Sequence, residues 1–536
     1  MFGRMGLGRL GTLNPPAPRG GAALLRGETG LGIDFTDSSG VGSVAVIGHS
    51  TNYSNVPVDG FLTQSGTSPK LVRNASGTYV WSPHNLALYS EDLTNWTNVN
   101  TSDSAAVLTA SAGNAVHSIT RVPSTLIAGA TYYARVKLTA GTHGFAYLNV
   151  RGDASEDHVT AVINLTSGAI TETDVGTTSG TIVSSSSVAD GSGWYVVLVF
   201  SVVATSAPVF CVGIPAGAAG NTFTATGETT WNAAGTETIS VQYAQLNRGT
   251  TPTTYLATTS AAKFAVPMDY DSGWAMLVEP AATNLILNNA TMSTQNVTTS
   301  AVAYTLSFFG TGTITLSGTS TAGPLVGTGA ANRVSLTFTP SAGTLTLTVS
   351  GSVTMAQIET GSVATSPVPT FAAPVTRAAD NINVATSALP YSATAGTVLI
   401  NAVPYQVAID KYLVSISDGT TNERIQLYDF APAAKAWMSD GGAVQVNALV
   451  AGSNGNAVAG ALFKVGLAWS ANDVALVKDA GTAGTDASAT LPTPTIMYIG
   501  NRYDGAGGNE MWNGRISSLI YLPRRMTNAD LVTRTT

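Results

Sequence analysis

The sequence has little charge and almost no cysteine. Only 10% of its 536 residues are charged, whereas a typical soluble domain has about 25%. The one cysteine, Cys211, cannot form an intramolecular disulfide, and its apolar neighbours in the run 209–212 favour a buried thiol over a nucleophile. Stability must therefore come from packing, and no Cys/His cluster is available to hold a structural zinc ion.

An excess of basic residues and a long apolar run are also missing. The formal net charge is −7, which argues against nucleic acid as a partner because phosphate binding needs clustered Lys and Arg. No run reaches the roughly 18 apolar residues that a membrane span requires, and the longest, Trp194–Phe200, is typical of a buried strand. The N-terminus lacks the apolar core of a signal peptide, so we expect no export by the general secretory pathway.

Threonine, serine, asparagine and glycine take the place of the missing charge. Thr and Val suit the pleated, half-buried surface of a sheet, while Gly, Asn and Ser supply the turns between strands. Runs such as 304–309 and 344–349 alternate polar and apolar residues with period two, which indicates one wet and one buried face. We predict an all-β chain of serial antiparallel β-sandwiches, with three or four domains for a chain of this length.

An internal repeat marks two of these modules. The Asn-Leu pair at Asn85 recurs at Asn284, and the Ala-Gln stretch 244–254 recurs at 356–366. We expect each Asn-Leu strand to open a module and each Ala-Gln strand to close it, because the first and last strands of a sandwich tend to lie together. The second copy is much the shorter, so we interpret it as a reduced version of the first.

Three stretches resemble a recurring design of phage structural proteins. The segment 85–96 (Asn-Leu-Ala-Leu-Tyr-Ser-Glu-Asp-Leu-x-x-Trp) resembles the start of carbohydrate-binding-module-like jelly rolls in phage tail fibres. The stretches 277–285 and 374–380 are similar to the joints of such modules. The last 150 or so residues resemble a concanavalin-like (laminin-G-like) sandwich that ends in a short helix capped at Thr527. The resemblance covers roughly residues 70–536.

The repeat, the resemblance and the composition together give five predicted segments. Residues 1–30 are rich in Gly, Arg and Pro and cannot bury enough apolar area to fold alone, so they are either a floppy tail or a docking peptide. The predicted segments are a virion-anchoring segment at 1–30 with candidate anchors Phe2, Arg4, Met5, Leu7 and Arg9, a small β-rich connector at 31–84, a jelly-roll module at 85–262, a shortened jelly-roll repeat at 263–379, and the concanavalin-like sandwich at 380–536.

The resemblance implies a structural protein of a tailed-phage virion, assembled in the cytoplasm of the bacterial host. A tail or collar fibre with host-glycan-binding potential is the favoured role; a capsid decoration or head-fibre protein and a polysaccharide depolymerase are the alternatives. The implied partners are other virion proteins, host surface polysaccharide and further copies of the chain, with a homotrimer as the usual symmetry of such appendages. Neither nucleic acid nor a membrane is expected as a partner.

Catalytic motifs are not found in the sequence. The five histidines lie in unrelated segments, without zinc-ligand spacing, and no Gly-x-Ser-x-Gly elbow occurs. A glycosidase needs two carboxylates across a cleft, but solubility at strand edges explains Glu423, Asp429 and Asp440 equally well. We therefore predict that the chain is not an enzyme and requires neither a metal nor a cofactor.

Glycan binding has more support in the sequence of the last module. Sugar sites combine aromatic faces for stacking with amide and charged groups that hydrogen-bond to hydroxyls. The stretch 501–504 lies in a Gly-rich loop, where sandwiches carry function; the opposing interpretation is that the aromatics are core residues and Arg502 is a solvated charge. The candidate glycan-binding residues are Tyr428, Trp437, Asn501, Arg502, Tyr503 and Asp504.

Overall fold

The computed structural model confirms the all-β prediction, since antiparallel sheets carry almost all of the regular structure. In the part of the chain that it describes, no helix is long and apolar enough to cross a membrane. The candidate anchors between Phe2 and Arg9 lie outside the described residues. The structure describes residues 21–536 except 26–27, 37–41, 49–52, 153–155, 178–180, 202–207, 408–409, 430–432, 453–456, 503 and 505–509.

The terminal sandwich consists of two sheets that pack on one large apolar core. Helix α1 (Gly21–Leu25) and helix α2 (Asn528–Arg534) lie beside it, and α2 begins where the Thr527 side chain accepts the Asp530 amide, as predicted. The larger sheet has the order β3 (Tyr53–Pro57), β2 (Ser43–Ile47), β1 (Gly30–Asp34), β45 (Gly514–Leu522), β36 (Ala395–Pro404), β41 (Phe463–Ser470), β42 (Asp473–Lys478) and β43 (Gly484–Asp486), with β24 (Met268–Tyr270) and β25 (Trp274–Val278) added at β45. The facing sheet has the order β4 (Thr63–Gln64), β35 (Ile382–Ala385), β44 (Ile496–Ile499), β37 (Lys411–Ser417), β38 (Arg424–Asp429), β39 (Ala434–Asp440) and β40 (Ala443–Val450).

The jelly-roll module has two six-stranded sheets around a separate core. One sheet has the order β17 (Thr181–Asp190), β18 (Gly193–Ser201), β13 (Thr131–Ala140), β22 (Thr238–Arg248), β10 (Val107–Ala110) and β9 (Thr101–Ser104). The other has the order β16 (Ile170–Val175), β15 (His158–Asn164), β14 (Phe145–Arg151), β19 (Val209–Gly213), β12 (Ser118–Arg121) and β8 (Thr97–Val99). Smaller sheets join β11 (Gly113–Val116), β21 (Thr229–Ala233) and β20 (Thr222–Phe223), and pair β7 (His84–Asn85) with β23 (Lys263–Phe264).

The shortened repeat is a small sandwich with its own core. Its sheets have the orders β31 (Gly329–Phe338), β28 (Tyr304–Gly310), β33 (Val353–Thr360), and β27 (Gln295–Thr299), β32 (Gly343–Ser350), β29 (Thr313–Gly318), β30 (Leu325–Val326). Strands β26 (Ala282–Asn284) and β34 (Val375–Arg377) pair at its base, and the hairpin β5 (Leu71–Arg73) and β6 (Tyr79–Trp81) lies at the joint. Short 3₁₀ turns occur at η1 (Val58–Gly60), η2 (Leu93–Asn95) and η3 (Thr386–Ala388).

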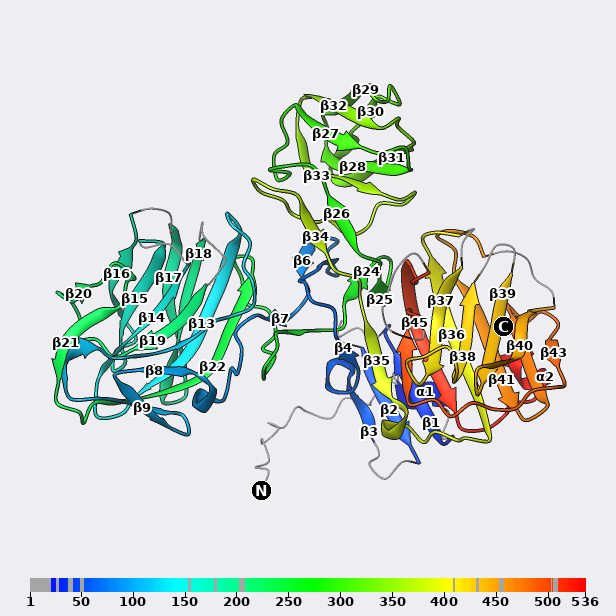
Figure 1. Cartoon of the computed structure of the whole chain (residues 1–536), viewed down its shortest axis with the longest axis horizontal. Helices are drawn as coiled ribbons and strands as arrows, with labels where there is room; N and C mark the ends of the chain where they lie inside the picture. The colour runs from blue at the N-terminus through cyan, green and yellow to red at the C-terminus, as the bar shows by residue number, and fades with distance from the viewer. Residues whose placement is uncertain are drawn as a thin grey trace, which may run out of the picture.

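The modules are nested along the chain, and this differs from the predicted connector at 31–84. Strand β1 pairs with β45, with Leu31 opposite Tyr521, so the N-terminal strands belong to the terminal sandwich. The alternating apolar residues Leu31, Ile33 and Val44 are wholly buried in that core, which explains why this segment is not an independent unit. The chain leaves the sandwich after β4, builds the jelly roll, returns for β24 and β25, builds the shortened repeat and returns again. In Figure 1 the two modules accordingly project from the sandwich as separate bodies.

The predicted opening and closing strands of both modules lie together, joined by one buried asparagine in each. The Asn85 amide donates to the carbonyls of Ala244 and Leu256, and its oxygen accepts the amides of Ala87 and Leu246. Asn284 makes the same four contacts in the second copy, to Ala356, Val368, Ile286 and Ile358. The repeat in the sequence is therefore a repeat of hydrogen bonds.

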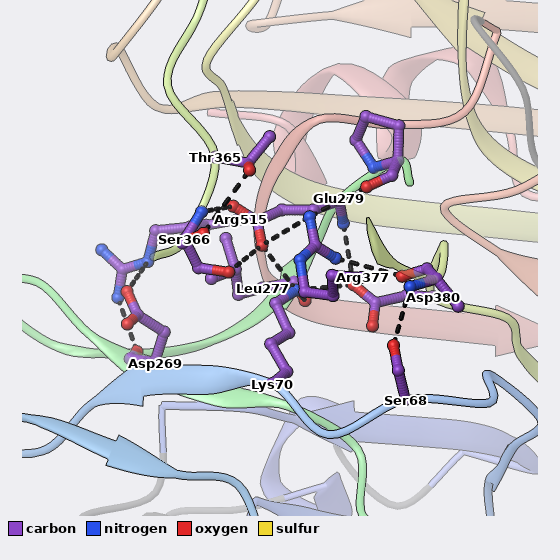
Figure 2. A network of polar contacts seen from close by, with 12 residues as sticks. Ser68, Lys70, Asp269, Leu277, Glu279, Thr365, Ser366, Arg377, Asp380 and Arg515 are labelled. Carbon is purple, nitrogen blue, oxygen red and sulfur yellow. Dashed lines mark hydrogen bonds and ion pairs between the residues drawn. The ribbon is translucent and has the colours of Figure 1, made fainter. Parts of the chain in front are cut away.

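A buried polar network joins the shortened repeat to the terminal sandwich where their linking segments meet (Figure 2). The Lys70 ammonium lies 2.9 Å from Glu279 and 2.6 Å from Asp380, and all three side chains are buried. Arg377 lies 3.5 Å from Glu279, and Ser366 donates both its amide and its hydroxyl to that carboxylate. Burial alone would raise the pKa of Glu279, but Lys70 and Arg377 outweigh it and hold the pKa at about 2. The carboxylate is therefore charged and fully bonded at neutral pH.

Buried His84 should make the jelly-roll module sensitive to acid. Its Nε2 accepts the Arg248 amide at 2.8 Å, and its Nδ1 lies 2.7 Å from the Ser82 carbonyl. Burial, reinforced by the charge of Arg248, lowers the pKa of His84 from 6.5 to about 4. The unfolded chain therefore binds the proton more tightly than the folded chain does. Neutral His84 adds about 3 kcal/mol to the free energy of unfolding above pH 6.5, and this stabilisation is lost as the pH falls from 6.5 to 4.

We expect the melting temperature of the jelly-roll transition, measured by scanning calorimetry, to fall between pH 6.5 and 4. The variant His84→Gln removes the titrating group, so it should melt lower at pH 7 but change less over this window. An equal pH dependence in His84→Gln and in the parent chain would show that another group is responsible.

Candidate functional site

The outer face of the facing sheet in the terminal sandwich carries a cluster of aromatic and cationic side chains. On β38, Ile425 and Leu427 point into the core, so the alternate residues point outward. On β39, Ala436 and Met438 are core residues and Trp437 lies on the outer side. Strand β37 adds Tyr412, which is paired with Tyr428. We name this surface the Trp437 face and define it as Tyr412, Arg424, Tyr428, Lys435 and Trp437.

Trp437 is the partly exposed aromatic group at the middle of this face. The Arg424 guanidinium carbon lies 5.5 Å from the centre of the Trp437 ring, a cation–π contact. The indole N–H donates to the Ser439 hydroxyl at 2.9 Å, which fixes the ring orientation. The face thus offers an oriented aromatic plane beside a guanidinium group.

The two tyrosines beside Trp437 present neutral hydroxyl groups. Their rings lie 5.4 Å apart between centres. Burial, followed by the nearby Glu510 carboxylate, raises the pKa of Tyr412 to about 12, and burial also raises the pKa of Tyr428. Both phenols stay protonated near neutral pH and can donate as well as accept hydrogen bonds.

The structure brings some of the predicted loop residues to the edge of this face. Arg502 lies 2.6 Å from Asp504 and 3.2 Å from Glu510, and the Glu510 carbonyl accepts the Tyr412 amide. Asn501 points elsewhere, because it is wholly buried and its amide donates to the Asp380 carbonyl at the joint of the modules. We therefore place Arg502 and Asp504 at the site and leave Asn501 out. Candidate Tyr503 lies outside the described residues.

Among the predicted aromatics, Tyr428 is only 4% exposed, whereas Trp437 is partly exposed. The alternative interpretation, in which the aromatics are core residues, is right that Tyr428 is buried but wrong about its side of the sheet, because it lies on the outer face. Sequence reasoning missed Tyr412 and Arg424. The period-two alternation of 411–417 and 424–428 was the available signal for their face, but it does not reveal which strands pair.

A large cleft lies elsewhere, between the jelly-roll module and the terminal sandwich. It has a volume of about 760 Å³ and is lined by residues 59–67 and 256–264, together with Leu88 and Ser124. Burial raises the pKa of Asp59 to about 6, although its carboxylate accepts the Val266 amide at 2.6 Å. None of the predicted glycan-binding residues that the structure describes lines this cleft. Within the described part of the chain, no group of three or more His, Cys, Asp or Glu residues could hold a metal ion.

Comparison with known proteins gives partial likenesses of fold. No family model matches the sequence, and no curated protein matches it significantly. The carbohydrate-binding module CBM40 of the Ruminococcus gnavus IT-sialidase, solved with α2,3-sialyllactose, is similar over 27% of this chain and 83% of its own, with 16% identity and a TM-score of 0.24. A SAP-like pentraxin from Limulus polyphemus matches over 27% of this chain and 73% of its own, with 16% identity and a TM-score of 0.23.

The prediction that the chain is not an enzyme requires correction. The similar structures include the NanB sialidase of Streptococcus pneumoniae, with 11% identity over 28% of this chain and 26% of that one, at a TM-score of 0.23. The lack of sequence motifs is therefore no ground for excluding catalysis, and the prediction is withdrawn. A likeness this partial assigns neither a reaction nor a catalytic residue to this chain.

Proposed function

We propose that this chain is a glycan-binding structural protein of a tailed-phage virion and that the Trp437 face holds the sugar. The observation that carries the proposal is the oriented, partly exposed Trp437 indole between Arg424 and the two tyrosines. The apolar C–H face of a pyranose ring stacks on an indole plane, while guanidinium and phenol groups bond to its hydroxyls.

The resemblance of segment 85–96 to jelly rolls of phage fibres supports the virion part of the proposal, and so does the surface of the terminal sandwich. Its edge strand β40 exposes Val444 by 51% and Val450 by 44%. Exposed apolar residues on an unpaired sheet edge suit contact with a neighbouring subunit. We propose other virion proteins and further copies of this chain as those neighbours, and the particle as its location.

The variant Trp437→Ala should bind host surface polysaccharide at least about tenfold more weakly than the parent chain, since aromatic anchors dominate binding energy. Binding of the full chain to a panel of bacterial surface polysaccharides, followed by titration calorimetry on any that bind, measures this. Trp437→Phe keeps a ring and should retain part of the affinity.

The matched control is Val444→Ala, an exposed residue on the edge strand of the same sheet, which should bind like the parent. The proposal fails if the parent binds no polysaccharide on the panel. It fails equally if Trp437→Ala keeps full affinity with an unchanged melting temperature.

A further inference from the structure

The outer face of one jelly-roll sheet carries a second aromatic and cationic cluster. On β13, Tyr132, Ala134 and Val136 point into the core, so the residues between them point outward. Tyr195 from β18 and Tyr243 from β22 are their neighbours, and Tyr255 packs edge-on against Tyr243 at 5.7 Å. We name this surface the Arg135 face and define it as Tyr133, Arg135, Lys137, Tyr195, Tyr243 and Tyr255.

Arg135 is a cation without an anionic partner. Its guanidinium carbon lies 4.9 Å from the centre of the Tyr195 ring, but no hydrogen bond or ion pair joins it to any residue that the structure describes. Its Nε is buried without a partner. Lys137, by contrast, lies 2.7 Å from Asp190 and is neutralised.

Two wholly buried amide side chains on the same face also have an unpartnered oxygen. Gln245 is paired with Arg135 across the sheet, and Asn247 with Tyr133. Gln245 Oε1 and Asn247 Oδ1 accept no hydrogen bond from the described residues. Buried polar atoms are seldom left unbonded. Those two oxygens are covered by the protein, so the partly exposed Arg135 guanidinium is the unused polar group of this set that a ligand can reach.

The shortened repeat shows that the fold itself does not require this cluster. The register of β28 against β33 shifts between Ser307 and Phe309, as that of β13 against β22 shifts between Arg135 and Lys137. In both modules the residue before the Ala-Gln pair has positive φ, Tyr243 at 53° and Met355 at 48°. The bulge is thus common to both modules, but the residue paired with the Gln of the Ala-Gln pair is Arg135 in the jelly roll and Ser307 in the shortened repeat. The cation on that face of the shortened repeat, Arg333, lies over the Phe309 ring and donates to the Thr365 carbonyl and the Ser307 hydroxyl, so its guanidinium is already bonded.

We propose that the Arg135 face is a second saccharide site and that its ligand is a carboxylated sugar. A guanidinium group binds a carboxylate through paired N–H donors, and Arg135 is the group on this face with no counter-charge of its own. The rings of Tyr195 and Tyr243 offer planes for the C–H face of the sugar. This site and the Trp437 face lie on different modules, so an experiment can refute one of the two proposed sites and leave the other standing.

Titration calorimetry of the full chain with trigalacturonate and maltotriose, at one ionic strength, tests the proposal. The two sugars match in length and in α-1,4 linkage but differ in the carboxylates and in the configuration at C4, so the Arg135→Gln variant is what isolates the contribution of the carboxylate. We expect saturable binding of trigalacturonate, at least tenfold weaker binding of maltotriose, and at least tenfold weaker binding of trigalacturonate to Arg135→Gln. Trp437→Ala should bind trigalacturonate as the parent does, which separates this site from the other.

Arg121→Gln is the matched control, because Arg121 also lies over a tyrosine ring, that of Tyr89 at 4.7 Å, but on the other sheet. It should leave binding unchanged. The proposal is overturned if trigalacturonate does not bind, if maltotriose binds equally well, or if Arg135→Gln keeps full affinity. A variant that melts at the parental temperature excludes misfolding as the cause of a loss.

Discussion

Replacing Lys70 by methionine is expected to lower the free energy of unfolding of the terminal sandwich by about 3–5 kcal/mol, the usual cost of breaking a buried ion pair. The substitution leaves Glu279 and Asp380 buried without the ammonium that lies within 2.9 Å of both. Arg377, at 3.5 Å from Glu279, compensates only in part. Chemical denaturation measures the loss, and hydrogen exchange with mass spectrometry should locate faster exchange in β4, β25 and β35.

The control for this prediction is Asp473→Asn. Asp473 is 57% exposed and lies 2.6 Å from Arg525, so its removal breaks a surface ion pair. Such pairs contribute at most about 1 kcal/mol. If Lys70→Met lowered the free energy of unfolding as little as Asp473→Asn, the network in Figure 2 would not be what holds the shortened repeat to the sandwich.

Each of the variants Asn85→Ala and Asn284→Ala should destabilise its own module, by at least about 3 kcal/mol for Asn85→Ala and at least about 2 kcal/mol for Asn284→Ala, since each unsatisfied buried group costs about 1–3 kcal/mol. Asn85→Ala removes the side-chain partner of four buried backbone groups. Asn284→Ala removes that of the Ile286 and Ile358 amides, whereas the Ala356 and Val368 carbonyls still accept from Asn289. Hydrogen exchange should increase across 85–262 in Asn85→Ala and across 284–377 in Asn284→Ala.

Exposed asparagines in the same modules provide the controls. Asn232→Ala in the jelly roll and Asn296→Ala in the shortened repeat should change the free energy of unfolding by no more than about 0.5 kcal/mol, as surface substitutions do. Loosening of both modules by a single asparagine variant would contradict the view that each is an independent unit with its own core.

The sequence was sufficient to predict the β class and the pairing of opening with closing strands. Both depend on patterns that neighbouring residues carry, namely period-two alternation and the repeated Asn-Leu and Ala-Gln segments. The nested topology could not be predicted, because the contact between β1 and β45 joins the two ends of the chain. Alternation shows that Leu31 and Ile33 face a core, but it does not show which core.

The candidate site was predicted by residue type and corrected by geometry. Trp437 and Tyr428 share a face because β38 and β39 are neighbours. Arg502 lies at the edge of this face because it forms an ion pair with Glu510, whose carbonyl accepts the Tyr412 amide. The same reasoning failed for Asn501, whose polar side chain satisfies a buried carbonyl instead of a ligand. It also overlooked the Arg135 face, since β13, β18 and β22 are distant in sequence and only their pairing assembles the cluster.

A crystal structure of the full chain with a fragment of a polysaccharide that it binds would show whether the Trp437 face is a saccharide site. We expect a sugar ring stacked on the Trp437 indole, with hydroxyls within hydrogen-bonding distance of Arg424 or Tyr412. Density for the sugar in the cleft between residues 59–67 and 256–264, with the Trp437 face bare, would contradict it.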